Sequence, residues 1–315
     1  MSRTFDRRSF LKAGALVSLT PFVPRGLFAS VLPGNGAFPA MKSAGAVVSI
    51  VKGTDYYKAT VKALDLLGGM KQFVSRNATV GLLVNSRYDK PGTFVKPEIT
   101  LAVLKMCIDA GASSIYTIEG VSRKYWDRSE LSGQFIEEIR SIKPGNDRSA
   151  EVEIPKGISL KKAEIARAYL DCDVLINIPI VKDHEGIRTT GSLKNIMGAT
   201  SHTTNRYFHL GSGASGYYDD VQFLSQCIAD ANLLRRPTLC VMDATEFITT
   251  NGPFGPGKVA KIQKVIAGSD PVAVDSVGVG MLGLNANDIV KIRLAYEHGL
   301  GLMNKEQITV KEGAI

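Results

Sequence analysis

The sequence has few cysteines, and they are not arranged to hold a metal cluster. Only four occur among 315 residues, and no pair has the C-x-x-C spacing. Closely spaced cysteines hold iron–sulfur clusters and zinc ribbons, so we expect neither. Each cysteine lies in or beside an apolar segment, which favours buried free thiols; an exported location would also permit a disulfide. The cysteines are Cys107, Cys172, Cys227 and Cys240.

Surplus charge is also scarce once the first residues are set apart. The whole chain has a formal net charge of +8. Residues 1–46 hold six of the 38 basic residues and one of the 30 acidic residues, which leaves 32 against 29, or +3, for the remainder. Nucleic-acid-binding domains normally carry a strongly basic face. We therefore expect no nucleic-acid partner.

Near the N-terminus the chain lacks an apolar run of the ~20 residues that span a bilayer. The run from Ala13 to Val23 is interrupted by Pro21 and follows the paired arginines of Asp6-Arg7-Arg8-Ser9-Phe10-Leu11-Lys12. This layout is typical of a twin-arginine export signal; a short N-terminal membrane anchor is the alternative. We expect the twin-arginine export machinery as a partner, a periplasmic or otherwise extracytoplasmic location, and no stable membrane span.

The rest of the chain alternates between strand-like and helix-like segments. Apolar, β-branched runs predict strands at residues 46–52, 78–84, 114–118, 151–154, 173–180, 238–242 and 265–267. Helical periodicity predicts helices at residues 57–67, 97–110, 162–169, 192–197, 221–234, 272–281 and 288–298. The sequence thus predicts a signal and N-terminal segment at residues 1–46, with its cleavage site open, and one α/β domain at 47–315. Its sheet is mostly parallel or mixed and is flanked by helices.

The segment richest in chemistry follows the predicted strand at residues 173–180. Three of the four histidines lie within 26 residues there, together with basic residues: His184, His202, His209, Lys182, Arg188 and Lys194. Loops at the carboxyl ends of strands gather along one edge of an α/β sheet and form its ligand crevice. Polar residues that follow other strands are expected at the same edge: Asn85, Arg87, Glu119 and Asp243. We predict a small-molecule site; the alternative is that these loops are polar because they are exposed.

Individual side chains in this segment have more than one possible role. His184 could be a general acid or base, or a metal ligand with His202 or His209. Lys194, next to Asn195, could bind an anion or hold a cofactor through its amine; a solvated lysine is the alternative. We expect His298 to be a surface histidine without a function.

Two glycine-rich stretches resemble phosphate-binding loops only in spelling. Gly211–Gly216 fits G-x-G-x-x-G, but no strand precedes it, so we interpret it as a flexible loop. Asn251–Lys258 contains two prolines, which lack backbone donors, and a structural turn is favoured. Asp270 is expected to cap the helix that follows it.

Three passages together resemble the bacterial and archaeal domain-of-unknown-function family numbered 362. They are Lys182-x-His184 with Ser192-Leu-Lys-Asn195, Asn251-Gly-Pro with Gly255 and Gly257, and Ala267-Gly-Ser-Asp270-Pro-Val-Ala-Val-Asp275 with His298-Gly-Leu-Gly301. The resemblance extends from about Val47 to Gly301 and implies a fold but no activity. Some members carry ferredoxin-like cysteine motifs, which this chain lacks.

A shorter resemblance is to the nickel-dependent lactate racemases, and it rests on the spacing of His184, Gly191 and Lys194. It implies that His184 transfers protons, that Lys194 carries a nickel-pincer nucleotide, and that His202 or His209 ligates nickel. Those enzymes use a second acid–base histidine from an earlier loop. The comparable loop here, residues 119–123, contains none, so Glu119 or Lys182 would have to replace it.

The sequence therefore predicts an exported protein that acts on a small hydroxy acid or sugar-like metabolite by proton or hydride transfer, as a racemase or epimerase does. The alternative is a non-catalytic extracytoplasmic protein that binds an anion or a metal. The cofactor is unknown, with nickel or a nickel-pincer nucleotide implied by resemblance alone. Catalytic candidates are His184, Lys182 and Glu119. Cofactor-binding candidates are Lys194, Asn195, Arg188, Asn85 and Arg87, and metal-binding candidates are His202 and His209.

Overall fold

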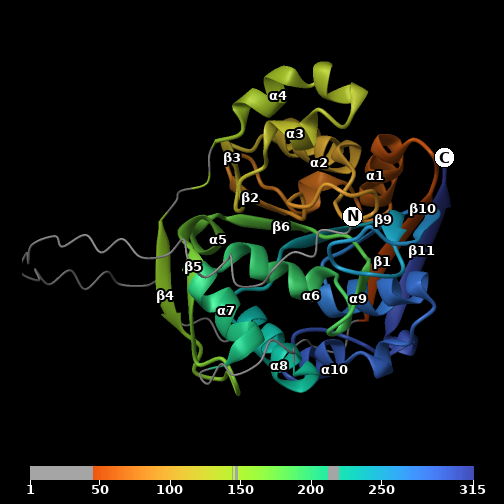
Figure 1. The fold of residues 1–315 in the computed structure, drawn as a ribbon. Coiled ribbons are helices and arrows are strands. Elements are labelled where there is room, and N and C mark those ends of the chain that lie inside the picture. Colours follow the sequence, from red (N-terminus) through yellow and green to blue (C-terminus); the bar gives the residue numbers. More distant parts are fainter. Residues whose placement is uncertain (1–44, 144, 146–147, 212–219) are drawn as a thin grey trace, which may run out of the picture. The chain divides into compact units, whose positions relative to one another are not determined.

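One seven-stranded sheet organises the part of the chain that the computed structural model describes, residues 45–143, 145, 148–211 and 220–315 (Figure 1). Its strands lie in the order β11-β1-β10-β9-β6-β2-β3. All pairings are parallel except those of β10 with β1 and β9, so only β10 runs against the others. The strands are β1 (Ala46–Lys52), β2 (Thr79–Val84), β3 (Ser114–Thr117), β6 (Val174–Ile178), β9 (Leu239–Ile248), β10 (Val259–Gly268) and β11 (Ile308–Ala314).

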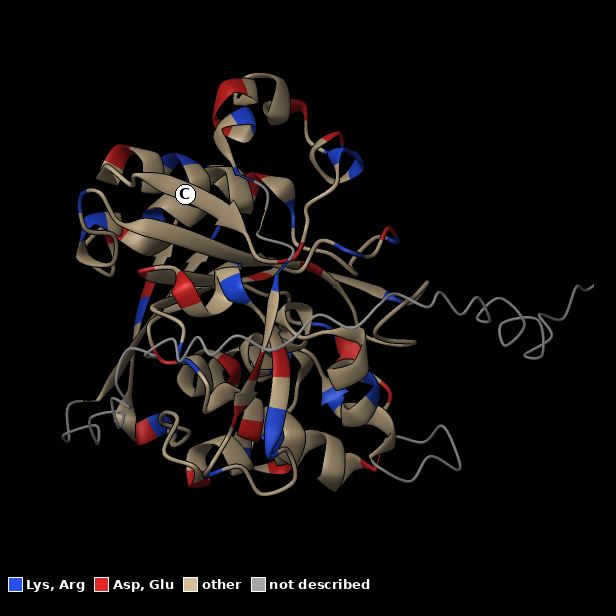
Figure 2. Cartoon of the chain, turned by 90° about the vertical axis from the view of Figure 1, so that its left-hand side faces the viewer, with Lys and Arg blue, Asp and Glu red and all other residues tan. Residues whose placement is uncertain are grey.

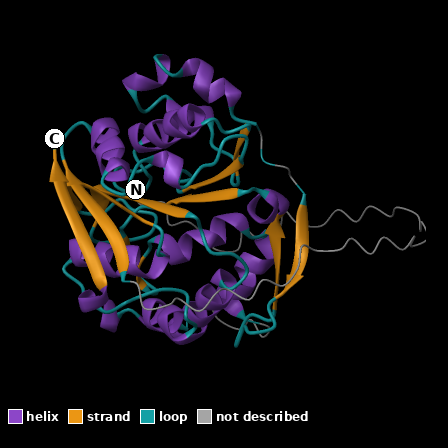
Figure 3. Ribbon diagram, turned by 180° about the vertical axis from the view of Figure 1, so that it is seen from behind, coloured by secondary structure: helices purple, strands orange, loops and turns teal. Residues whose placement is uncertain are grey.

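Helices cover both faces of the sheet (Figures 1 and 3). One face is covered by α1 (Tyr56–Asp65) and α2 (Pro97–Ala110), and the other by α6 (Ser192–Asn195), α8 (Val221–Asn232), α9 (Pro271–Gly278) and α10 (Val290–Glu297). Two apolar cores result: Leu82 of β2 belongs to the first core and its neighbour Leu83 to the second. Strands that are buried on both faces have sequences that are continuously apolar. The predicted α/β fold with a mostly parallel, mixed sheet is confirmed.

Smaller elements surround this framework. They are the helices α3 (Arg123–Trp126), α4 (Ile136–Ser141), α5 (Arg167–Asp171) and α7 (His202–Leu210), and the two-stranded pairs β4 (Ser149–Glu153) with β5 (Lys162–Ala166) and β7 (Asp183–His184) with β8 (Arg188–Thr189). Short 3-10 helices are η2 (Met70–Gln72), η3 (Glu130–Gly133), η4 (Ile196–Ala199), η5 (Val279–Leu282), η6 (Ala286–Asp288) and η7 (Lys305–Gln307).

Helix boundaries set by local chemistry agree with the sequence. Helix α2 starts at Pro97 and ends before Gly111, whose φ of 90° is a conformation that favours glycine. Asp270 caps α9, because its Oδ1 accepts hydrogen bonds from the backbone N–H groups of Val272 and Ala273, both at 2.9 Å. Both predictions are confirmed.

One predicted helix is partly wrong, and one helix was not predicted. Residues 162–166, predicted as part of a helix, form strand β5, because they pair with β4 and bury alternate side chains at Ala163 and Ile165. Helix α7 lies in a stretch where no helix was predicted, and Ser201 caps it by accepting from the Thr204 N–H.

Three other boundaries also differ from the prediction. Strand β9 continues through Asp243 to Ile248 and pairs with a β10 that is longer than predicted. Asp243 is therefore a buried residue within a strand and not a loop residue. Strand β11 was not predicted, because it lies at the sheet edge and exposes most of its side chains.

The first 44 residues, which include the predicted export signal, lie outside the described residues, as does most of the Gly211–Gly216 stretch. The described residues belong to a compact unit at Ala40–Ile315. Within them, no helix is both long and apolar enough to cross a membrane. Figure 2 shows basic and acidic residues interspersed along this part of the chain.

Candidate functional site

The loop from residue 179 to 191 leaves the carboxyl end of β6 and is fixed to its neighbours through the backbone. The Val181 N–H donates to the Asp243 carbonyl at 3.0 Å, which ties the loop to β9. The Thr190 hydroxyl donates to the Ile180 carbonyl at 2.8 Å and closes the loop on itself. This geometry buries Lys182 and His184, which the sequence places on the loop.

Lys182 is buried with no carboxylate beside its amine among the described residues. Lys182 is only 1% exposed, and its Nζ donates a hydrogen bond to the Thr93 carbonyl at 2.5 Å. The amine also lies 4.4 Å from the centre of the Tyr88 ring. Burial, with a contribution from the positive charge of Lys194, lowers the pKa of Lys182 to about 7. The amine is therefore partly neutral near physiological pH.

A second buried lysine, Lys291 of α10, contacts the same loop at its end. Its Nζ donates to the carbonyl oxygens of Thr189 and, at 2.8 Å, Thr190. Burial lowers the pKa of Lys291 to about 7, although Asp275 opposes this shift. We call Lys182, Lys194 and Lys291 the lysine cluster. Lys291 was not among the residues predicted from the sequence, where its one signal is its place on the apolar face of α10 with Leu294 and Ala295.

His184 is held as a neutral imidazole. Its Nδ1 accepts hydrogen bonds from the backbone N–H groups of Gly186 at 3.1 Å and Ile187 at 3.4 Å, so the ring hydrogen lies on Nε2. Burial lowers the pKa of His184 to about 2, and the charges of Lys194, Lys291, His209 and Lys182 contribute. In this arrangement His184 is a hydrogen-bond donor and lacks a free lone pair for use as a base.

Asp275 connects two of the passages that carry the family resemblance. Its carboxylate accepts from the N–H groups of Ser192 at 2.5 Å and Leu193 at 3.1 Å, at the start of α6. Gly191 has a φ of 127°, and a Cβ there would lie 2.5 Å from Asp275 Oδ1, so the position requires glycine. Burial raises the pKa of Asp275, which Lys291 and these two N–H groups oppose. Asp275 thereby fixes the backbone that carries Lys194.

Three asparagines connect α6 to the sheet. Asn85 Nδ2 donates to Asn195 Oδ1 at 3.0 Å, and Asn195 Nδ2 donates to Asn177 Oδ1 at 2.7 Å. Asn177 Nδ2 donates in turn to the Ser192 carbonyl at 2.8 Å. Asn195 is therefore used in holding α6, whereas the buried Asn85 Oδ1 accepts no hydrogen bond from the described residues. That oxygen is an acceptor that a ligand hydroxyl could satisfy.

Glu119 lines a cavity of about 1060 Å³ that we call the Glu119 cavity. Its wall includes Trp126 and Gly198 but none of Lys182, His184 and Lys194. A Cβ on Gly198 would lie 2.7 Å from Glu119 Oε2, so the carboxyl group packs against that glycine. Burial raises the pKa of Glu119, and the exposed Arg87 opposes the shift. The structure thus separates candidates that the sequence grouped at one edge.

The remaining candidates lie at the margin of the lysine cluster. His202 is exposed at the first residue of α7, and His209 is half-buried in its last turn. The seven residues from His202 to His209 correspond to a rise of about 10 Å along the helix, so the two side chains lie in different places. Of the two, only His209 contributes to the lowered pKa of His184. Arg188 pairs with His184 across β7 and β8, is exposed, and has a φ of 67°. No group of three or more His, Cys, Asp or Glu side chains suited to a metal occurs in the described part.

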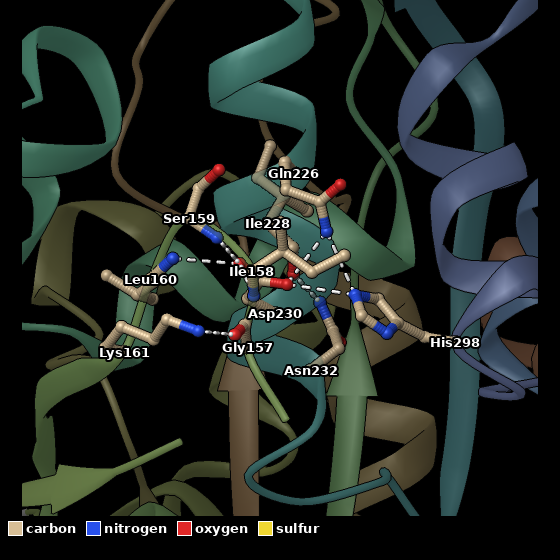
Figure 4. A network of polar contacts seen from close by, with 10 residues as sticks. All are labelled: Gly157, Ile158, Ser159, Leu160, Lys161, Gln226, Ile228, Asp230, Asn232 and His298. Atoms are coloured by element: carbon tan, nitrogen blue, oxygen red, sulfur yellow. Dashed lines mark hydrogen bonds and ion pairs between the residues drawn. The ribbon is translucent and has the colours of Figure 1, made fainter. Parts of the chain in front are cut away.

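His298 is not the surface histidine that the sequence predicted, because its ring is only 14% exposed and is hydrogen-bonded (Figure 4). Its Nε2 lies 2.9 Å from both Asp230 Oδ1 and Gln226 Nε2. The other Asp230 oxygen accepts from three consecutive backbone N–H groups, at residues 158, 159 and 160, at 2.7–2.9 Å. His298 therefore helps to position a buried carboxylate that holds a loop.

The four cysteines are free and buried, so that prediction is confirmed. Burial raises the pKa of each thiol, as at Cys227, whose pKa is about 12. A thiol with a raised pKa is a weak nucleophile near neutral pH.

The fold and this loop define an α/β protein with a cluster of three lysines, two of them buried, at the carboxyl edge of its sheet. The chain belongs to the family described as domain of unknown function DUF362, whose model matches residues 80–280. A thylakoid-associated protein of Synechocystis sp. is 24% identical over 272 residues, which are 81% of this chain and 79% of the relative.

Two solved structures share lower similarity with the chain. The lactate racemase apoprotein from Thermoanaerobacterium thermosaccharolyticum is 14% identical with a TM-score of 0.44, over 74% of this chain and 56% of that one. A Thermotoga maritima protein is 13% identical with a TM-score of 0.43, over 78% of this chain and 60% of that one. The chain thus spans less than two thirds of either structure.

Proposed function

We propose that the protein is an enzyme that moves a proton on a small hydroxy acid or sugar-like anion, with Lys182 as the base. The observation that carries this proposal is a buried amine whose pKa is lowered to about 7. Above that pH the Lys182 amine is mostly neutral and has a lone pair, and below it the amine is charged. Lysines with lowered pKa values are typical of catalytic sites.

The charge around Lys182 favours an anionic substrate. Lys194 lowers the pKa of Lys182, His184 and Lys291, which means that positive charges face one another in this region. A carboxylate bound there would reduce that repulsion. When a proton leaves the carbon beside a carboxylate, negative charge develops on its oxygens, and fixed positive charge stabilises that state. Lys194 would bind the carboxylate, and Asn85 Oδ1 would accept a hydrogen bond from a substrate hydroxyl.

His184 has a different role in this proposal from the one expected from the sequence. With Nδ1 engaged by two backbone N–H groups, His184 would donate a hydrogen bond from Nε2 to a substrate oxygen. Glu119 lines a different cavity and would not serve as the second base. One amine that removes a proton from one carbon and returns it to the neighbouring carbon on the same face is sufficient for an isomerase, and it also exchanges that proton with solvent. Inversion at a single carbon would need a proton donor on the opposite face as well.

Proton exchange tests this function without knowledge of the natural substrate. The protein is incubated in deuterated buffer with a panel of 2-hydroxy acids and sugar acids, and loss of the α-proton signal is followed by NMR. We expect exchange that increases as the pH rises through about 7 and is lost in Lys182→Met. Lys90→Met, on an exposed residue of the nearby loop, is the matched control. Undiminished exchange in a folded Lys182→Met protein would show that Lys182 is not the base.

Lys194 and His209 are the residues that would hold the nickel-pincer nucleotide implied by the lactate racemase resemblance. Both lie close enough to His184 to lower its pKa, whereas His202 does not contribute, and the positive charge suits a phosphate-bearing group. Such a cofactor, when bound, supplies a hydride acceptor. Intact mass and metal analysis of protein recovered from its native host tests this, because an adduct lost in Lys194→Ala supports attachment there. An unmodified mass without nickel contradicts it.

Non-catalytic binding of an anion is the second candidate, and the same excess of positive charge favours it. In that case calorimetry would detect stoichiometric binding of lactate or phosphate, weakened by Lys194→Ala, while no member of the acid panel exchanges its α-proton. A titration with nickel in the same instrument covers the metal-binding form of this candidate. Exchange with turnover would exclude the second candidate.

We also propose that residues 1–46 direct export by the twin-arginine machinery to an extracytoplasmic location. The support is the sequence Arg7-Arg8-Ser9-Phe10-Leu11 followed by a moderately apolar run. Cell fractionation tests it: replacing Arg7 and Arg8 together by lysine should retain the protein in the cytoplasm. Replacement of Arg3 and Arg25 by lysine is the matched control, because neither belongs to the pair. Equal export of both variants would contradict the proposal.

A further inference from the structure

The Glu119 cavity is large enough for a small molecule. Its volume of about 1060 Å³ lies at the upper end of the ~300–1,000 Å³ typical of ligand pockets. It is bounded by the carboxyl end of β3, by α3 and α4, by the β4–β5 hairpin, and by η4. Much of its wall is apolar, with contributions from Val121, Trp126, Ile136, Ile139 and Ile142. Such a wall favours an occupant with an apolar part.

Positive charge exceeds negative charge around the cavity. Among the described residues, four basic residues line it, Arg123, Arg140, Lys143 and Arg148, against the two acidic residues Glu119 and Asp127. Arg123 lies 3.9 Å from Asp127, and Arg140 lies 2.7 Å from Glu137, so these two cations already have partners.

Lys143 and Arg148 have no such partner among the residues that the structure describes. Lys143 lies 5.8 Å from the centre of the Tyr116 ring, and no carboxylate of the described residues forms an ion pair with Lys143 or Arg148. An anionic group on the ligand would complete both. Their position at the cavity wall, next to the apolar side chains, matches a molecule with an anionic end and an apolar body.

We propose that the Glu119 cavity binds a small amphipathic carboxylate, with its anionic group at Lys143 and Arg148 and its apolar part against Trp126, Ile139 and Ile142. This site is separate from the lysine cluster and does not depend on the proposed function. Glu119 lies against Gly198 at the cavity wall and provides a polar contact for a hydroxyl or carbonyl group of the ligand.

Trp126 is the one tryptophan of the chain, so its fluorescence reports on this cavity alone. The probes are hexanoate, octanoate and decanoate, with octanol as the uncharged counterpart, each kept below its aggregation concentration. We expect saturable changes in tryptophan emission, an affinity that increases about fourfold per added methylene, and binding of octanol at least tenfold weaker than that of octanoate. Calorimetry should give one site.

Two variants separate charge recognition from other effects. Lys143→Glu combined with Arg148→Glu should weaken octanoate binding at least tenfold and leave octanol binding unchanged. Lys124→Glu is the matched control, because Lys124 is next to Arg123 on α3 but does not line the cavity. Lys182→Met should bind octanoate normally, which distinguishes this site from the lysine cluster. Equal affinity for octanol and octanoate, or normal octanoate binding by the double variant, would overturn the proposal.

Discussion

The lysine cluster and the Glu119 cavity both lie near the carboxyl ends of parallel strands, yet their basic side chains have different surroundings. In the lysine cluster, Lys182 and Lys291 are buried and their amines donate to backbone carbonyls of the protein. In the cavity, the basic residues lie beside open space and apolar walls. The fold itself therefore sets the protonation of the first region, while a ligand is needed to complete the second.

The two regions also differ in the sign of the charges that are brought together. Burial, together with the positive groups nearby, lowers the pKa of Lys182 to about 7 and that of His184 to about 2. Glu119 and Arg87 have opposite charges, and burial still raises the pKa of Glu119. Burial thus favours the neutral form in both regions, because water stabilises a charge better than the protein interior does. If burial keeps Lys182 and Glu119 neutral, substitutions at these residues should change the pH dependence of stability.

The largest expected effect comes from Asp275, which supports the lysine cluster. Asp275→Ala removes the acceptor for the Ser192 and Leu193 N–H groups and the nearby opposite charge of Lys291. We expect a loss of about 3–5 kcal/mol in the free energy of unfolding, as for other buried charges left unpaired. Urea unfolding at pH 7 measures it. Asp65→Ala, on an exposed helix residue, should change stability by less than about 0.5 kcal/mol. Similar values for both variants would show that Asp275 does not hold the cluster.

A smaller effect is expected for Lys182, and it depends on pH. The pKa of Lys182 is lower in the folded than in the unfolded protein, so folding releases a proton between pH 7 and 10 and stability rises with pH there. Lys182→Met removes this contribution, which is at most about 1.4 kcal/mol per pH unit. The variant should therefore gain stability relative to the wild type at pH 7, and the difference should shrink at pH 9. Lys90→Met should follow the wild type at both values; an equal difference at pH 7 and 9 would contradict the lowered pKa.

The sequence predicted what depends on neighbouring residues. Pro97, Gly111 and Asp270 act within one turn of the helix ends that they define, so their roles follow from residue type and position. The rule that loops gather at the carboxyl ends of strands placed Lys182 and Glu119 at the same edge, as the topology confirms. That rule gives an edge and no distance, so it could not show that Glu119 faces a cavity that Lys182 does not line.

Contacts between distant residues could not be derived from the sequence. Residues 162–166 form a strand because β4 supplies the hydrogen bonds. Lys291 lies 102 positions from Thr189, whose carbonyl it contacts, and His298 lies 68 positions from Asp230. Polar residues on an apolar helix face were the only available signal for Lys291. The site therefore combines a loop that the sequence shows with contacts from distant parts of the chain, such as those of Thr93, Asp275 and Lys291.

The smallest expected effect concerns Glu119 and completes the comparison. Burial raises its folded pKa above the unfolded value, so its charged form destabilises the protein at pH values above the folded pKa, and this effect vanishes where the carboxyl is protonated in both states. Glu119→Gln should therefore stabilise the protein at pH 7, by less than the Asp275 substitution destabilises it, and should match the wild type near pH 4. Glu130→Gln, on an exposed residue, is the control. Chemical unfolding at both pH values measures the difference. A Glu119→Gln protein less stable than the wild type at pH 7 would mean that the nearby Arg87 charge outweighs burial, and the two regions would then differ in how burial acts on their charges.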